Sequence, residues 1–282
     1  MPAMAEDLRT ERKGRILAVR DLPTLPKVLE EVSKLVERPD STTEQVAKLI
    51  SMDQVLSAKV LKMVNSPVYG FPGRISSIGH ALVLLGFNVL RSIIVSTSVF
   101  EVMSENMVGL WEHSLGAAMA SGAVARMVKL KDAEEYAVAG LLHDLGKVVA
   151  TVQLPDLKPE IERVVAERDC FYLEAEREVL GFGHDRINAW LADHWKLPAN
   201  IKEGLSYHHK PHLAQLYPEM ACVVHLGDFL VRSFEYGFSG DVGVTYLQPE
   251  ALKILKIRPA DFENLLDELS GQLVELADLR FT

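Results

Sequence analysis

Apolar residues recur along this chain with the three-to-four-residue spacing of amphipathic helices. Val32, Leu35 and Val36 share one face of a first helix, and Arg38-Pro39-Asp40 ends the pattern. Thr42 and Gln45 then have the Thr-x-x-Gln form of a capping box, which predicts the start of a second short helix. A third apolar stripe stops at Asn65-Ser66-Pro67, because proline lacks the N–H group that a further turn needs.

The same spacing continues to the end of the chain. It predicts further helices over 77–85, 87–103, 111–128, 134–145, 159–168, 185–195, 198–207, 218–235 and 259–279. The one alternating stretch, 242–246, is too short and isolated to make a sheet. We therefore predict an all-α fold. The last helix carries a leucine stripe that either closes the core or forms the seam of a homodimer.

Histidine is distributed unevenly, and this suggests how the chain is divided. His80 alone precedes residue 105, and the other eight histidines follow it. We predict an N-terminal extension (1–20), an N-terminal helical bundle (21–105), a histidine-rich domain (106–240) and a C-terminal helical extension (241–282). Because no Pro/Gly/Ser-rich linker separates the two halves, we expect the bundle to pack on the histidine-rich domain.

Composition and charge limit the classes of partner. The 282 residues are 48% hydrophobic and carry a formal charge of −9, which disfavours nucleic acid and anionic lipid as partners. Cys170 and Cys222 form no CxxC pair, so neither a disulfide framework nor a thiolate zinc site is supported. The N-terminus lacks the apolar core of a signal peptide, and His80, Gly86 and Arg91 interrupt the most apolar stretch. We expect a cytoplasmic protein that does not span a membrane.

The strongest chemical signal is His143-Asp144, an imidazole beside a carboxylate at the end of an apolar helix. Imidazole nitrogen together with carboxylate oxygen suits a borderline first-row metal ion. A single His-Asp pair also occurs as a histidine hydrogen-bonded to its neighbour. Further candidate ligands elsewhere in the chain favour a metal site over such a hydrogen-bonded pair. They are His113, His184, His208, His209 and Asp228.

Asp228 is the most informative of these additional residues. It lies among apolar residues of a predicted helix, where an unpaired carboxylate would lose its hydration. A buried carboxylate is tolerated in a protein core when it binds a metal ion, pairs with a cation or is capped by hydrogen bonds. His225 lies one turn earlier and is either a core histidine or a residue that orients a ligand. His80, His194 and His212 have no assignment.

Several blocks of sequence together resemble the bacterial HDOD family, a signalling branch of the HD superfamily of metal-dependent phosphohydrolases. The resemblance covers roughly residues 20–235. Its blocks are 52–67, 75–86, Trp111-Glu112-His113-Ser114, 140–147, His184, Trp195-Lys196-Leu197-Pro198, His208-His209-Lys210-Pro211 and Asp228. It implies an N-terminal helical bundle packed on an HD-type helical metal-binding domain.

The resemblance also implies a ligand set. His113, His143, Asp144 and Asp228 match the core ligands of the superfamily, and His184, His208 and His209 match the additional ligands of dinuclear HD-GYP relatives. We therefore expect two divalent transition-metal ions (Fe, Mn, Ni or Zn), with Asp144 between them as a catalytic residue. Lys147 is the second catalytic candidate because it could neutralise a phosphate oxygen. Its alternative is a solvated charge at a helix end.

Three functions follow from this resemblance. The first is a signal-transduction output or regulatory protein that keeps a metal centre and binds an unknown protein partner. The second is an active phosphohydrolase acting on a nucleotide or another phosphate ester. The third, an oxygenase, occurs elsewhere in the superfamily but has no cue of its own here. Cleavage of cyclic di-GMP is not expected, because His208-His209-Lys210-Pro211 is not followed by the Gly-Tyr-Pro signature.

Overall fold

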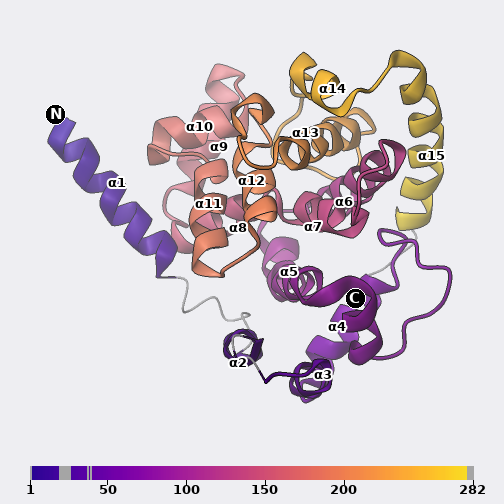
Figure 1. Cartoon of the computed structure of the whole chain (residues 1–282). Helices are drawn as coiled ribbons and strands as arrows, with labels where there is room; N and C mark the ends of the chain where they lie inside the picture. The colour runs from indigo at the N-terminus through magenta and orange to yellow at the C-terminus, as the bar shows by residue number, and fades with distance from the viewer. Residues whose placement is uncertain (1, 19–26, 37, 39, 278–282) are drawn as a thin grey trace.

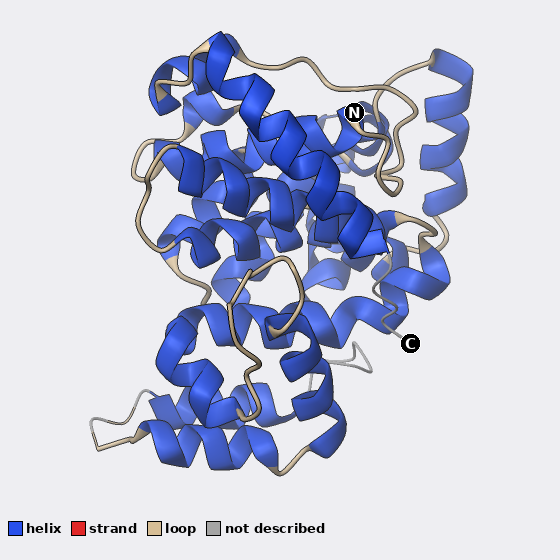
Figure 2. Cartoon of the chain, turned by 90° about the vertical axis from the view of Figure 1, so that its right-hand side faces the viewer, coloured by secondary structure: helices blue, strands red, loops and turns tan. Residues whose placement is uncertain are grey.

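The computed structural model describes residues 2–18, 27–36, 38 and 40–277 as helices joined by loops (Figure 2). No strand occurs among these residues, and this confirms the predicted all-α class. The alternating stretch 242–246 lies in a loop. Figure 1 shows a smaller layer of helices at the bottom and a larger body above it.

The N-terminal part supplies α1 to α5. Their bounds are Pro2–Leu17 (α1), Lys27–Val36 (α2), Thr43–Ser51 (α3), Gln54–Val64 (α4) and Ile78–Asn106 (α5). The predicted capping box starts α3: Thr42 Oγ1 accepts from the N–H of Gln45 at 3.3 Å, and Gln45 Oε1 accepts from the N–H of Thr42 at 3.0 Å. Asn65 ends α4 as predicted, and its side-chain amide also donates to the Ile75 carbonyl at 2.8 Å.

Helix α5 contains the predicted break in the apolar stretch. Gly86 has φ 72° and ψ 170°, a left-handed conformation that separates two helical segments. By length and composition, Ile78–Thr97 is the one helical stretch of the described residues that could cross a membrane, but 61% of its most apolar window is buried inside the protein. Helix α5 packs on α3 and α4.

The larger body contains the remaining helices. Their bounds are Leu110–Met127 (α6), Ala133–Leu142 (α7), Leu145–Gln153 (α8), Lys158–Arg168 (α9), Tyr172–Leu180 (α10), His184–His194 (α11), Ala199–Tyr207 (α12), Pro211–Leu213 (the short 3₁₀ helix η2), Pro218–Ser233 (α13), Pro249–Leu255 (α14) and Pro259–Ala277 (α15). Helices α6, α7, α12 and α13 pack together, and α5 packs on α6, α7 and α8. The N-terminal bundle therefore packs on the histidine-rich part, as expected. The predicted boundary at residues 20 and 21 lies outside the described residues, and the other boundaries stay predictions.

Four α-helices of the described residues were not predicted, namely α1, α8, α10 and α14, and neither was the 3₁₀ helix η2. The predicted helix over 134–145 is wrong at its end, because the backbone turns at His143 and Asp144 between α7 and α8. Helix α1 is polar along most of its length, and it contacts residues that are distant in the sequence. Ile16 is fully buried, and Arg12 donates to the Val179 carbonyl at 2.7 Å.

Helix α15 closes the core against α6, which is one of the two alternatives for its leucine stripe. Leu269 is fully buried, whereas Leu266 on the same helix is 38% exposed. We expect Leu269→Ala to lower the free energy of unfolding by about 2–5 kcal/mol. Leu266→Ala is the matched control, with a loss below about 1 kcal/mol. Equal losses in urea unfolding would contradict core packing of α15.

Candidate metal centre

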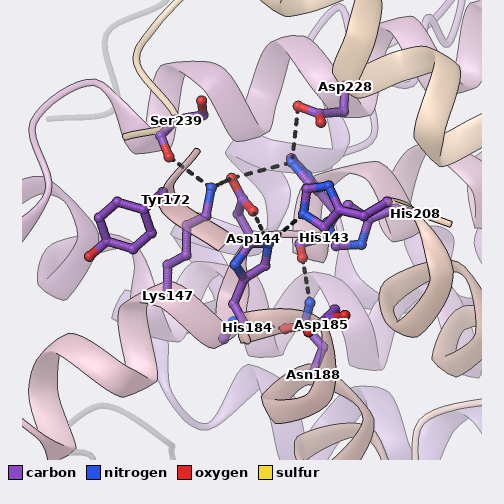
Figure 3. A network of polar contacts seen from close by, with 12 residues as sticks. His143, Asp144, Lys147, Tyr172, His184, Asp185, Asn188, His208, Asp228 and Ser239 are labelled. Carbon is purple, nitrogen blue, oxygen red and sulfur yellow. Dashed lines mark hydrogen bonds and ion pairs between the residues drawn. The ribbon is translucent and has the colours of Figure 1, made fainter. Parts of the chain in front are cut away.

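Five separate segments carry the seven predicted ligands to one place inside the larger body. Figure 3 labels His143, Asp144, His184, His208 and Asp228 among them. These segments are α6 with His113, the turn between α7 and α8 with His143 and Asp144, the start of α11 with His184, the end of α12 with His208 and His209, and α13 with Asp228. The ligand atoms form two groups of three residues joined by Asp144. The unassigned His80, His194 and His212 belong to neither group.

The first group consists of His113, His143 and Asp228. His113 Nε2 lies 3.2 Å from His143 Nε2 and 3.1 Å from Asp228 Oδ1. His143 Nε2 lies 3.6 Å from the same carboxylate oxygen. All three side chains are buried. Two imidazoles and one carboxylate thus point their ligand atoms at a common position, which we call the inner triad.

The second group consists of His184, His208 and His209, which we call the outer triad. His184 Nε2 lies 2.8 Å from His209 Nε2, and the His208 and His209 rings are 4.0 Å apart between centroids. His184 and His208 are fully buried, whereas His209 is half-buried. Three imidazoles without a carboxylate of their own form this group, so a cation held there would need another anion nearby.

Asp144 lies between the two triads and supplies that anion. Its Oδ2 is 3.4 Å from His143 Nε2, and its Oδ1 is 3.3 Å from His184 Nε2. Asp144 Oδ1 and His208 Nε2 are buried and have no hydrogen-bond partner among the described residues. Unpartnered buried acceptors are unusual, and nitrogen with carboxylate oxygen is the donor set that borderline divalent metals prefer. The residues therefore fit a divalent metal.

Hydrogen bonds on the far side of three imidazoles fix how the rings are turned. His143 Nδ1 donates to the Gly140 carbonyl at 2.7 Å, and His208 Nδ1 donates to the Leu205 carbonyl at 2.9 Å. His184 Nδ1 lies 2.6 Å from Glu176 Oε2, which also accepts from the backbone N–H of His184 at 2.8 Å. In each case Nε2 is left to face the centre, as metal-ligating histidines require.

Burial and neighbouring charges set the protonation of the centre. Burial raises the pKa of Asp144, but His143 and Lys147 outweigh this effect, so its pKa lies well below the usual range. Burial lowers the pKa of His208 to about 4 and holds the pKa values of His184 and His209 well below 6.5. The outer triad is therefore neutral near pH 7, as a ligand set must be.

His143 behaves differently from the outer imidazoles. Burial lowers its pKa, but Asp144 and Asp228 outweigh burial and raise the pKa to about 9. Without a metal, this imidazole therefore carries a proton near neutral pH and satisfies the two carboxylates. A metal ion held by the inner triad would supply the positive charge between the carboxylates in place of that proton.

Lys147 is buried, with 1% of its surface exposed, so the alternative of a solvated charge is wrong. Its Nζ donates to Asp144 Oδ2 at 2.8 Å and to the Ser239 carbonyl at 2.8 Å. The ammonium group also lies 5.6 Å from the centroid of the Tyr172 ring (Figure 3). Lys147 therefore places a positive charge directly beside the carboxylate that joins the two triads.

Arg232 is the most important functional residue that the sequence analysis missed. Its Nε donates to Asp228 Oδ1 at 2.7 Å, and its Nη1 donates to Asp241 Oδ2 at 2.7 Å. Asp241 Oδ1 in turn accepts from the backbone N–H of Tyr172 at 2.5 Å. The sequence analysis gave an ion pair as the alternative to metal binding for Asp228. This ion pair is present, and Asp228 is also a member of the inner triad. The spacing of Asp228 and Arg232, four residues apart on one helix, was the available signal.

Glu176 and Asn188 were also missed. Asn188 donates to the carbonyls of His143 and Leu205, and its Oδ1 accepts from the Gly146 N–H at 2.7 Å. It therefore ties the turn that carries His143 to the end of α12. No sequence pattern marks these two residues as special. His225 contributes in a similar way, because its Nδ1 donates to the His208 carbonyl at 2.7 Å.

Removing the Glu176 carboxylate is expected to weaken metal binding at the outer triad. Glu176→Ala leaves His184 Nδ1 without its partner, so the ring is free to turn, and metal affinity should fall about 10- to 100-fold. Titration of chelator-treated protein with Zn²⁺ or Mn²⁺ measures this loss. Glu178, exposed on the same helix and paired with Arg168, is the matched control. A loss of the same size in Glu178→Ala would contradict the positioning role of Glu176.

Comparisons with known proteins show the family of this chain. Residues 22–211 match the HDOD domain family. A protein of Treponema pallidum (strain Nichols), described as uncharacterized, is 29% identical over 225 residues, which make up 76% of this chain. The matched region is 43% of that relative, so the chain spans less than half of its length.

Solved structures share the fold over nearly the whole chain. An HDOD domain protein with unknown function from Geobacter sulfurreducens is 26% identical, with a TM-score of 0.65, and the match covers 97% of this chain and 94% of that chain. A candidate phosphohydrolase from Shewanella amazonensis SB2B is 25% identical, with a TM-score of 0.67, over 93% and 96% of the two chains. Because the HDOD match spans more than half of the sequence, this protein belongs to the HDOD domain family.

Proposed function

We propose that this protein is a metal-dependent phosphohydrolase with a dinuclear centre, acting in bacterial signal transduction. One observation carries the proposal: the two carboxylate oxygens of Asp144 face two different groups of ligands, the inner and the outer triad. A carboxylate shared between two neighbouring divalent ions is the arrangement that two-metal hydrolases use. Fe, Mn, Ni and Zn all suit a mixed set of imidazole and carboxylate ligands.

The chain's own residues have defined parts in this activity. The inner triad and Asp144 would hold one ion, and the outer triad with Asp144 would hold the other. When bound, such ions activate water for attack on phosphorus. Asp144 stays ionised because His143 and Lys147 stabilise its charge. The Nζ atom of Lys147 lies beside the centre, where it can donate to an oxygen of the phosphate ester.

The biological setting follows from family membership and composition. We propose a cytoplasmic protein that receives its signal from a protein partner and acts on a phosphorylated small molecule. The charge of −9 disfavours nucleic acid, and α5 is mostly buried rather than membrane-facing. The exposed residues Leu266 and Val274 on α15 leave room for a homodimer contact outside the core stripe.

Metal analysis together with a hydrolysis assay tests this proposal. Protein purified without an affinity tag should contain about two transition-metal ions per chain and should hydrolyse bis(p-nitrophenyl) phosphate. The double variant His143→Ala, Asp144→Ala should contain no metal and show no hydrolysis, while its helical content stays the same. Hydrolysis that survives in the double variant would contradict the proposal.

A second candidate function is a signalling module in which the metal only stabilises the fold. Two observations favour it: six of the seven ligands are at most 2% exposed, and Lys147 is already bonded to the Ser239 carbonyl. In that case chelation lowers the melting temperature, because the binding energy of the metal adds to the stability of the folded state. No phosphate ester is then hydrolysed by the metal-loaded protein.

A further inference from the structure

One end of the candidate metal centre is covered by the loop that follows α13. Most residues of this loop, which spans 235–243 and which we call the strap, line a cavity of about 300 Å³ together with His113 of the inner triad. Phe238 donates its backbone N–H to the Gly109 carbonyl at 2.8 Å. Gly237 has φ 71°, and a Cβ atom there would overlap the backbone nitrogen of His113. The strap therefore lies directly against the helix that carries His113.

The strap inserts one carboxylate into the protein. The side chain of Asp241 is 6% exposed, although the next residue, Val242, is 98% exposed. Asp241 Oδ2 accepts from Arg232 Nη1 at 2.7 Å, and its Oδ1 accepts from the backbone N–H of Tyr172 at 2.5 Å. A buried carboxylate loses its hydration and needs such partners. An otherwise exposed loop thus holds an anionic group against a buried arginine at the edge of the cavity.

The strap engages two cations that lie beside the candidate ligands. Arg232 donates to Asp228 and also to the strap carboxylate. Lys147 donates to Asp144 and also to the Ser239 carbonyl of the strap, as Figure 3 shows. Each cation therefore holds one carboxylate of the centre and one oxygen of the strap. These strap oxygens occupy N–H donors that a ligand of the centre would otherwise meet.

Arg232 has donor capacity that the strap leaves unused. Its side chain is 4% exposed, and its Nη2 has no hydrogen-bond partner among the described residues. Buried guanidinium groups usually have their N–H groups paired, and their planar fork suits oxyanions that accept two hydrogen bonds. Asp241 gives Arg232 a single oxygen, because its other oxygen is bonded to Tyr172. A phosphate group has enough acceptor oxygens to satisfy Nη2 as well.

We propose that the cavity under the strap is an anion-binding site that the strap itself occupies. The Asp241 carboxylate and the Ser239 carbonyl take the positions of phosphate oxygens, and a phosphate group that enters displaces the strap. Arg232 and Lys147 then exchange one oxygen partner for another, so the buried arginine keeps a counter-anion. This inference rests on the proposed function for the identity of the anion. It adds regulation of the same site, because the strap closes the inner triad until a phosphate group releases it.

Hydrogen–deuterium exchange with inorganic phosphate tests the proposal on the full chain as purified. The Phe238 N–H is bonded to the Gly109 carbonyl only while the strap is in place. At a phosphate concentration that saturates binding in isothermal titration calorimetry, exchange at Phe238 should become about tenfold faster. This measurement uses the unmodified protein, so it decides the proposal whatever the stability of any variant.

Asp241→Asn tests the same exchange from the side of the protein. This variant should speed exchange at Phe238 without phosphate, and it should bind inorganic phosphate at least about tenfold more tightly, since the anion no longer competes with a carboxylate. Glu235→Gln is the matched control. Glu235 lines the same cavity and carries the same charge, but it is exposed and forms no ion pair with another described residue. Its loss should change phosphate affinity by less than about twofold.

Three results would overturn the proposal. They are a lack of phosphate binding, exchange at Phe238 that phosphate leaves unchanged or slows, and equal phosphate affinity in Asp241→Asn and Glu235→Gln. The outcome is separate from that of the hydrolase proposal. If phosphate releases the strap but bis(p-nitrophenyl) phosphate is not hydrolysed, the strap proposal is supported and the hydrolase proposal fails. If the ester is hydrolysed but phosphate leaves the strap in place, the hydrolase proposal is supported and the strap proposal fails.

Discussion

Replacing Asp144 by alanine is expected to empty both metal positions, whereas replacing His209 is expected to empty one. Asp144 faces both triads through its two oxygens, and its Oδ1 lies beside His184 Nε2, whereas Glu176 contacts Nδ1 on the far side of that ring. Without it, three neutral imidazoles must hold a divalent cation with no compensating negative charge. His209 contacts the outer triad alone. Metal content should fall from about two ions to none in Asp144→Ala and to about one in His209→Ala.

Elemental analysis of the purified variants measures this difference, and hydrolysis of bis(p-nitrophenyl) phosphate measures its consequence. Asp144→Ala should fall to the background rate, because no metal remains to activate water. Asp156→Ala is the control, since this aspartate is exposed, pairs with Arg15 and belongs to neither triad. Loss of a single ion in Asp144→Ala would mean that the carboxylate serves one triad only, and the dinuclear interpretation would then be wrong.

Removing the Arg232 side chain is expected to destabilise the fold more than any other single charge change considered for this protein. Arg232→Ala leaves Asp228 and Asp241 buried without their shared cation, and breaking a buried ion pair costs about 3–5 kcal/mol. Burial raises the pKa of Asp228, and Arg232 is the largest influence that lowers it. The variant should therefore lose unfolding free energy near pH 7, where an unpaired carboxylate remains charged.

The direction of the pH effect follows from this pairing. In the native protein the pKa of Asp228 lies well below its usual range, so the pair stabilises the fold above the unfolded pKa of aspartate and loses this effect as the pH falls through the folded pKa. The difference in stability between wild type and Arg232→Ala should therefore shrink in acid. Urea unfolding at pH 7 and at a series of pH values below about 3.9, the unfolded pKa of aspartate, measures it. Arg163→Ala removes an exposed ion pair with Glu167 and should change the free energy of unfolding by less than about 1 kcal/mol. A loss that small in Arg232→Ala would contradict the structural role of this arginine.

The sequence predicted local structure well where a single physical cause acts on neighbouring residues. The capping box at Thr42, the stop at Asn65 and the break at Gly86 were all confirmed, because each depends on hydrogen bonds or backbone angles within one turn. Helix α1 was missed, since its polar sequence has little amphipathic pattern and its contacts with Asp156 and Val179 are made across the chain.

The candidate ligands could be found from the sequence for a related reason. A histidine or aspartate within an apolar stretch loses its hydration on folding, so its presence there indicates a partner or a metal. Asp228 shows this clearly, because it is buried and lies beside both His113 and Arg232. Glu176 and Asn188 carry no such mark in the sequence, and only the packing of α10 and α11 around the centre shows what they hold.

By itself, then, the sequence determined the all-α class, most helix ends and which residue types are available to bind metal. The tertiary structure decided how these residues are grouped. It placed His113 and Asp228, which are far apart in the chain, 3.1 Å apart in one triad, and it turned the Asp144 carboxylate to face both triads. It also buried Lys147 against Asp144. Helix ends depend on interactions within a few residues, whereas the grouping of ligands depends on how distant helices pack, which no short stretch of sequence encodes.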